Sequence, residues 1–248
     1  MNERQMAEKN KILEVVSGSF LYGTNTETSD KDYVGIFMPN VEYILGFKRC
    51  DEVDFSTISK DEKNKNTQAA VDMKLYEFRR FVKLAMENNP NILEILFVNE
   101  ENRIFCNDIG KELLAIKCLF PHQGAKQRFL GYAVSQRHKM INCHGRAGNR
   151  EEIVSAHGYD TKFASHLIRL MFEGVELLET GSIEFPLKER RTILDIKQGK
   201  WEMSKVLDFS SELEKQIESI DSKLPAKPNV EALERFTINK LRNFMHNI

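Results

Sequence analysis

Apolar residues near the N-terminus occur in short runs, each with the length of a β-strand. One run covers residues 12–16, and a second covers residues 33–38 and stops at a proline. In a third stretch, residues 69–78, apolar side chains alternate with Asp72 and Lys74. Successive side chains of a strand point to opposite faces, so this alternation predicts a strand with one apolar and one polar face.

The pattern then changes to apolar residues three and four positions apart, which is typical of helices. The longest such stretch begins after Asp160, a good N-cap, and ends before Gly181, which suits the position past a helix end. Asn91 can cap a shorter helix. The predicted helices cover residues 77–87, 92–97, 107–119, 159–179, 204–224 and 229–245.

Together these patterns predict an α+β fold in two parts. A small mixed-sheet domain is expected over residues 1–118 and an all-helical domain over residues 119–248, with a cleft between them. Residues 59–68 are rich in Lys, Asp and Asn and are predicted to be a mobile loop. Residues 41–49 and 183–199 show no clear period.

Composition narrows the class of protein. The 248 residues carry a net charge of −1, so any binding of nucleic acid must use a local patch. The four cysteines are scattered without a C-x-x-C pair, which favours reduced thiols in a cytoplasmic protein over a zinc site. The polar N-terminus is not expected to act as a signal peptide, and the absence of a run of about 18 apolar residues predicts no membrane span.

The candidate chemistry lies between the first two predicted strands. Gly18-Ser19 follows the first strand, and Asp30 and Asp32 stand at the head of the second, where i and i+2 side chains share a face. Adjacent carboxylates repel unless a cation lies between them, and Mg²⁺ prefers carboxylate oxygens shared with substrate phosphates. Gly18-Ser19 would let a phosphate approach the backbone. A solvated turn and a helix cap explain the same residues without a ligand.

A third carboxylate could come from the predicted strand over residues 69–78. Asp72 projects from its polar face and would complete a cluster if this strand lies beside the strand that carries Asp30 and Asp32. The residues alone leave open whether Asp72 simply faces solvent, and Asp54 competes for the same role.

Two stretches in the second half are locally basic. Residues 119–150 contain no Asp or Glu but carry six Lys or Arg residues and three histidines. Lys162, His166 and Arg169 share one face of the longest predicted helix. Both stretches suit a triphosphate or an RNA backbone, and both are also explained by basic side chains that face solvent or pair with acids elsewhere.

These motifs resemble the signature of the DNA polymerase β-type nucleotidyltransferase superfamily, and more narrowly the RNA-repair-associated predicted nucleotidyltransferases. The matching pieces are Gly18-Ser19, Tyr22-Gly23, Ser29-Asp30-x-Asp32, Asn89-Pro90-Asn91 with Leu93-Glu94, Gly131-Tyr132, and Tyr159-Asp160-x-Lys162 with His166-Leu167-x-Arg169-Leu170.

The resemblance implies an enzyme that moves a nucleoside monophosphate from an NTP to an acceptor hydroxyl. It implies that Asp30, Asp32 and Asp72 hold two Mg²⁺ ions, with Mn²⁺ as a substitute, and that Gly18 and Ser19 contact the triphosphate. Lys162, His166 and Arg169 would contact nucleotide or acceptor. An RNA end, such as that of a tRNA, is the implied acceptor. A protein-modifying nucleotidyltransferase and a catalytically silent nucleotide- or RNA-binding module of the same fold remain alternatives.

Overall fold

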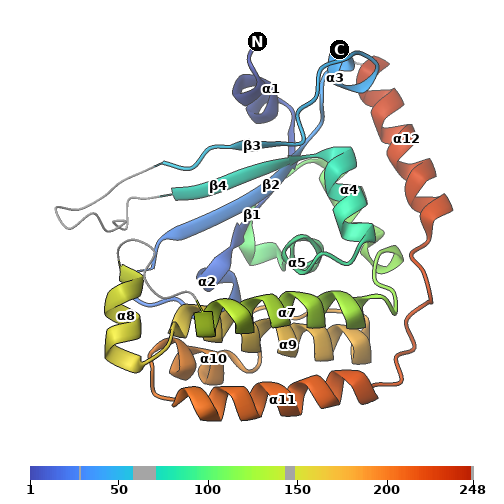
Figure 1. Cartoon of the computed structure of the whole chain (residues 1–248). Coiled ribbons are helices and arrows are strands. Elements are labelled where there is room, and N and C mark those ends of the chain that lie inside the picture. The colour runs from blue at the N-terminus through green and yellow to red at the C-terminus, as the bar shows by residue number, and fades with distance from the viewer. Residues whose placement is uncertain (28, 58–70, 143–148, 247–248) are drawn as a thin grey trace.

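A computed structural model describes residues 1–27, 29–57, 71–142 and 149–246. A mixed sheet lies over a layer of helices, most of which cover one of its faces (Figure 1). The sheet has five strands in the order β3-β4-β2-β1-β5. They are β1 (Lys11–Ser17), β2 (Lys31–Phe37), β3 (Glu52–Asp54), β4 (Val71–Glu77) and β5 (Arg103–Cys106).

Strand pairing places β2 at the centre of the sheet. β2 runs antiparallel to β1 and parallel to β4, while β3 and β5 pair antiparallel at the two edges. One sheet face carries Val34 and Ile36 into the main apolar core. The other face carries Phe37 and Leu75, which pack with Met6 of α1 (Glu3–Lys9) in a smaller cluster.

Short helices connect the strands. The first, α2 (Gly18–Tyr22), follows β1 directly and ends at Gly23 in the left-handed conformation. The others in this half are α3 (Val41–Ile44), α4 (Phe78–Met86), α5 (Pro90–Phe97) and α6 (Asp108–Ala115), with 3₁₀ turns over Glu100–Asn102 and Lys117–Leu119. Asn89, rather than Asn91, is the N-cap of α5, because Pro90 already fits the first helical position.

The rest of the chain is helical. It forms α7 (Ala125–Asn142), α8 (Asn149–His157), α9 (Thr161–Thr180), α10 (Arg190–Lys197), α11 (Met203–Ser219) and α12 (Val230–His246). The prediction for α9 is confirmed at both ends: the Asp160 side chain accepts hydrogen bonds from the backbone of Lys162 and Phe163, and Gly181 is the left-handed C-cap. The helix α9 packs against α7, α10 and α11.

The predicted α+β fold is confirmed. The apolar core is continuous across the expected boundary at residue 118: Ile36 and Leu93 belong to the same buried cluster as Phe129 and Leu167. The predicted loop over residues 59–68 lies outside the described residues. Within the described part of the chain, no helix is long and apolar enough to cross a membrane.

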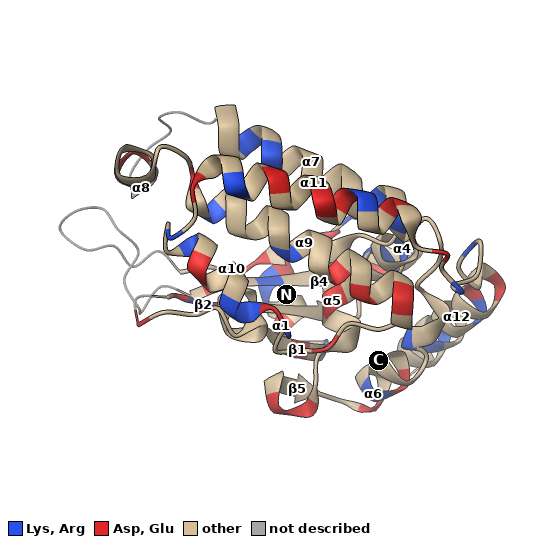
Figure 2. Ribbon diagram, turned by 90° about the horizontal axis from the view of Figure 1, so that it is seen from below, with Lys and Arg blue, Asp and Glu red and all other residues tan. Residues whose placement is uncertain are grey.

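The basic character of residues 119–142 has a local explanation on α7. Lys126 donates to the carbonyls of Glu218 and Ile220, Arg128 pairs with Glu87, and Arg137 pairs with Glu214. Ribbon segments of Lys or Arg residues and of Asp or Glu residues occur together where α7 and α11 lie side by side (Figure 2). These three cations answer groups on neighbouring elements, as the ligand-free explanation expects.

Candidate active site

The two acids predicted from separate strands meet at one edge of the sheet. Asp32 of β2 and Asp72 of β4 are direct partners in the parallel ladder, so their side chains leave the same face. Burial, together with the nearby carboxylates of Asp30 and Asp72, raises the pKa of Asp32 to about 6, against the pull of Lys162 and Lys197. Three acids and two lysines therefore share one electrostatic site.

Asp54, the competing acid, lies one strand further out. It pairs with Lys74 across the β3–β4 ladder, so β4 separates it from Asp32. Hydrogen bonds from Ser56 lower the pKa of Asp54. The hydroxyl of Ser56 also donates to Asp72 Oδ1 at 2.8 Å, which orients the Asp72 carboxylate. Asp72 is thus the third acid beside Asp32.

Gly18 lies directly against the Asp32 carboxylate. Its φ is +63°, and a Cβ at this position would overlap Asp32 Oδ2. Only glycine combines this backbone conformation with so close an approach. The turn that begins α2 is therefore held beside Asp32, and contact of Gly18 and Ser19 with a triphosphate stays a prediction.

Two lysines face the acids from the helical layer. Lys162 lies in the first turn of α9, next to the Asp160 cap. Lys197 ends α10 and donates its Nζ to the carbonyl of Thr24 at 3.1 Å, in the loop that leads to Asp30. Burial lowers the pKa of Lys197, and the charge of Lys162 lowers it further. Residues 183–199 gave no sequence pattern, so Lys197 had no signal by which it could be found.

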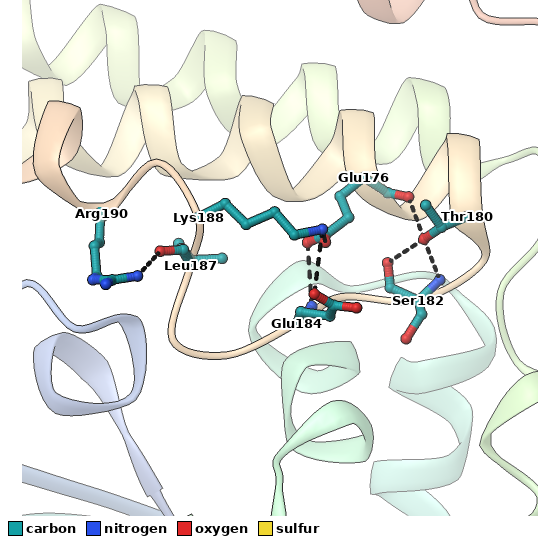
Figure 3. A network of polar contacts seen from close by, with 7 residues as sticks. All are labelled: Glu176, Thr180, Ser182, Glu184, Leu187, Lys188 and Arg190. Atoms are coloured by element: carbon teal, nitrogen blue, oxygen red, sulfur yellow. Dashed lines mark hydrogen bonds and ion pairs between the residues drawn. The ribbon is translucent and has the colours of Figure 1, made fainter.

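Polar contacts hold together the elements that carry these lysines. Thr161 Oγ1 donates to the carbonyl of Lys197 at 3.0 Å, and Tyr159 donates its hydroxyl to the carbonyl of Trp201 at 2.6 Å. The segment between α9 and α10 is held by Lys188, which pairs with Glu176 and Glu184 (Figure 3). The same segment donates Leu187 N to the carbonyl of Tyr22, so α10 and α2 are tied together.

Arg169 lies elsewhere, although its position on α9 suggested a ligand contact. It is 4% exposed and donates to Glu94 Oε2 at 3.1 Å and to both oxygens of Glu173 at 2.8 and 3.0 Å. The hydroxyl of Tyr22 also donates to Glu94, at 2.8 Å. Two buried carboxylates balance the charge of Arg169. It is therefore not one of the proposed nucleotide contacts. His166 is half-buried one turn after Lys162, and its role stays a prediction.

The donor chemistry at this edge fits a divalent cation. Asp30, Asp32 and Asp72 offer hard oxygen ligands, and the raised pKa of Asp32 reflects burial and also repulsion from the other two acids, which a cation would relieve. Among the described residues no three acidic, histidine or cysteine side chains already converge as a metal-binding group. Side-chain rotation would therefore have to accompany metal binding.

Fold and site define the class as a nucleotidyltransferase of the polymerase β-like kind: a mixed sheet with acids on β2 and β4 and a Gly-Ser turn after β1. The family model described as "RNA repair pathway DNA polymerase beta family" matches residues 2–242. The chain belongs to this family.

Similar proteins were found at greater distance. An uncharacterized 38.9 kDa protein of Enterobacteria phage T4 is 31% identical over 189 residues, which is 75% of this chain and 51% of that protein. The chain thus spans about half the length of this relative.

Two solved structures match this chain at low identity. Spectinomycin adenyltransferase AAD(9) from Enterococcus faecialis, solved with ATP and spectinomycin, matches with a TM-score of 0.43 and 13% identity over 86% of this chain and 93% of that one. A nucleotidyltransferase-like protein from Exiguobacterium sibiricum matches with a TM-score of 0.30 and 11% identity over 93% and 70%.

Proposed function

We propose that this protein transfers a nucleoside monophosphate from an NTP to the terminal hydroxyl of an RNA. The observation that carries the proposal is the register of Asp32 and Asp72, which places two acids side by side with Gly18 against one of them. The family to which the chain belongs supports RNA as the acceptor.

In the proposed reaction, the acceptor hydroxyl oxygen attacks the α-phosphorus. A new O–P bond forms as the bond from the α-phosphorus to the bridging oxygen breaks, and pyrophosphate leaves. The hydroxyl proton passes to a carboxylate of the cluster and then to water. Lys162 and Lys197 lie close enough to Asp32 to balance charge on the phosphates, and the turn at Gly18-Ser19 offers backbone N–H groups to them.

The three acids would hold two Mg²⁺ ions, for which Mn²⁺ can substitute. Bound there, the metal supplies neutralisation of phosphate charge and a more acidic acceptor hydroxyl. Asp30, Asp32 and Asp72 would hold these ions, and the hydrogen bond from Ser56 keeps the Asp72 carboxylate oriented.

The test is transfer of label from each of the four α-labelled NTPs to a cellular RNA pool, with and without a chelator. We expect label on RNA in the presence of Mg²⁺, and an Asp32→Asn variant should lose transfer by about 100-fold or more. The matched control is Asp54→Asn, an acid on the next strand, which should retain transfer.

Unchanged transfer by Asp32→Asn would remove the proposed mechanism. Label that appears only on protein in parallel incubations would instead identify a protein-modifying enzyme. Binding of NTP without any transfer would identify a silent binding module.

A further inference from the structure

A concave surface lies on the helical layer, and none of Asp30, Asp32 and Asp72 lines it. A cavity of about 670 Å³ opens between the end of α4 and the middle of α7, and its walls include Met86, His122, Arg128, Gly131 and Tyr132. The volume is that of a small-molecule site. We call this cavity the α4–α7 groove.

The polar groups in the groove wall are held in place. Arg128 donates its Nε to the carbonyl of Glu87 at 2.9 Å and its Nη2 to the Glu87 carboxylate at 3.1 Å. His122 Nε2 lies 3.0 Å from the carbonyl of Met86, and His122 Nδ1 accepts from Gly124 N at 3.1 Å. The guanidinium of Arg128 and the imidazole ring of His122 therefore have fixed orientations, which suits the binding of a flat, amphipathic ligand.

Gly131 at the groove has no explanation within the fold. Glycine inside a helix costs about 0.5–1 kcal/mol relative to alanine. At Gly174 of α9 the glycine has a steric reason, because a Cβ there would lie 3.1 Å from Phe129. A Cβ at Gly131 would meet nothing within 4 Å. The Gly131-Tyr132 pair therefore leaves an open stretch of helix backbone facing the cavity.

The groove is connected to the acids through β4 and α4. The strand β4 ends at Glu77, where α4 begins, and Met86 at the end of α4 lines the groove. Tyr76 follows Asp72 by four residues on the same strand face, about 13 Å away at the usual strand rise. The path from Asp72 along β4 and α4 therefore leads to the groove wall at Met86, and Tyr132 of α7 forms another part of that wall.

In-line displacement fixes which substrate uses this path. The strand order puts the Gly18-Ser19 turn after β1, on one side of Asp32, and Asp72 on the other. If the leaving pyrophosphate lies against that turn, the attacking hydroxyl must come from the opposite side, where β4 lies. A chain that follows this direction reaches the α4–α7 groove beyond its reactive end.

We propose that the α4–α7 groove binds a nucleotide of the single-stranded RNA acceptor, upstream of its reactive terminus, with the base stacked on Tyr132 and its backbone passing over Gly131. This inference rests on the proposed function. A single unstacked nucleotide fits a cavity of this size, and single-stranded RNA is recognised by stacking on aromatic rings and guanidinium planes.

The experiment compares Gly131→Leu, which fills the groove, with Val134→Leu, a 50% exposed position of the same helix that does not line the groove. Acceptors are a long single-stranded RNA and a dinucleotide too short to reach the groove. We expect Gly131→Leu to raise KM for the long RNA about 10-fold, with kcat, KM for the NTP and dinucleotide use unchanged. Val134→Leu should match the wild-type protein in every assay.

Tyr132 provides a second variant that leaves the helix backbone as it is. Tyr132→Ala should raise KM for the long RNA as Gly131→Leu does, and Tyr132→Phe should retain wild-type use because its ring remains. Thermal melts of all variants establish that they are folded. Fluorescence anisotropy with a labelled single-stranded RNA measures binding directly, and the affinity should fall in parallel with the rise in KM.

Unchanged use of long RNA by both Gly131→Leu and Tyr132→Ala would overturn the inference and leave the proposed function standing. An equal loss with the dinucleotide would also overturn it, because that acceptor cannot reach the groove. A loss confined to a protein acceptor would replace RNA with protein as the occupant. A wild-type protein that labels no RNA would overturn the proposed function itself.

Discussion

Arg169 shows how a basic residue on a promising helix face can serve the fold instead of a ligand. It lies over the ring of Tyr22 at 4.3 Å and pairs with Glu94 and Glu173, so α2, α5 and α9 meet at one buried guanidinium. Glu94 is an acid inside the largely apolar helix α5, and its pairing with Arg169 explains why it is buried there. Tyr22 is the last residue of α2, which begins at Gly18. The cluster around Arg169 therefore helps to hold the turn at the active site.

Replacing Arg169 should destabilise the whole protein. Arg169→Met leaves two buried carboxylates without their cation, which we expect to cost about 3–5 kcal/mol in the free energy of unfolding. Chemical denaturation measures it, and Arg191→Met, at an exposed arginine of α10, is the control expected to change stability little. An Arg169→Met variant as stable as the control would mean that Glu94 and Glu173 can stay buried without the positive charge of Arg169.

The same cluster predicts a pH dependence of stability. Burial raises the pKa of Glu94 to about 7, against the attraction of Arg169, and burial likewise raises the pKa of Glu173. An acid whose pKa is raised by folding stabilises the native state below its unfolded pKa and loses that contribution as pH rises through the folded value. From about pH 4.5 to 7, Glu94 should lower the free energy of unfolding, by up to about 1.4 kcal/mol per pH unit.

Glu94→Gln removes this titration and keeps a hydrogen-bonding side chain of the same size. We expect urea titrations across this range to show a smaller fall in stability for Glu94→Gln than for the wild-type protein. Parallel curves for the two proteins would mean that Glu94 does not change protonation between the folded and unfolded states in this range.

Among the elements, those with a strong period or clear caps could be predicted from sequence. The apolar runs gave β1 and β2, the alternation gave β4, and Asp160 with Gly181 bounded α9. The edge strands β3 and β5 span three and four residues, too few to show a period. Both depend on pairing with a distant neighbour, which local sequence does not encode.

The site residues also divide into those that local sequence predicts and those that depend on contacts between distant elements. Asp30, Asp32 and Gly18 lie within one short motif, so their proximity could be read directly. The pairing of Asp72 with Asp32 required the parallel neighbour relation of β2 and β4, for which sequence offered only an expectation. Lys197 reaches the site through the packing of α10 on α9, and nothing near it in sequence signals that.

The turn at the start of α2 yields a prediction with a close control. Gly18→Ala combines a left-handed backbone with an overlap on Asp32, so it should cost about 1–2 kcal/mol and abolish most NMP transfer. Gly158→Ala shares the positive φ, at +79°, but its Cβ meets nothing within 4 Å. It should lose similar stability and keep its activity; equal activities in the two variants would contradict the role given to Gly18.

Across the molecule as a whole, one apolar core joins the sheet to the helical layer. Leu93 and Leu96 of α5 share a buried cluster with Phe129 of α7 and Leu167 of α9. The charged cluster around Arg169 crosses the same boundary. The sheet part and the helical part expected from sequence therefore share one apolar core. Cutting the chain after residue 118 would expose the apolar face of α5.

We expect residues 1–118 expressed alone to fail to fold and the full chain to unfold in one cooperative transition. Amide dispersion in NMR spectra tests the fragment, and calorimetry tests the full chain. A well-dispersed spectrum for the fragment, or two separate heat-absorption peaks for the full chain, would mean that the sheet and the helices are independent folding units.

Adding or removing one residue within β2 or β4 should harm this protein more than most substitutions. A shift of one position turns a strand's side chains over to the opposite surface. Asp32 and Asp72 would then emerge on different sides of the sheet, one of them among Phe37, Leu75 and Met6. The number of residues in each of these two strands is therefore constrained in its own right, whatever the identity of any single amino acid.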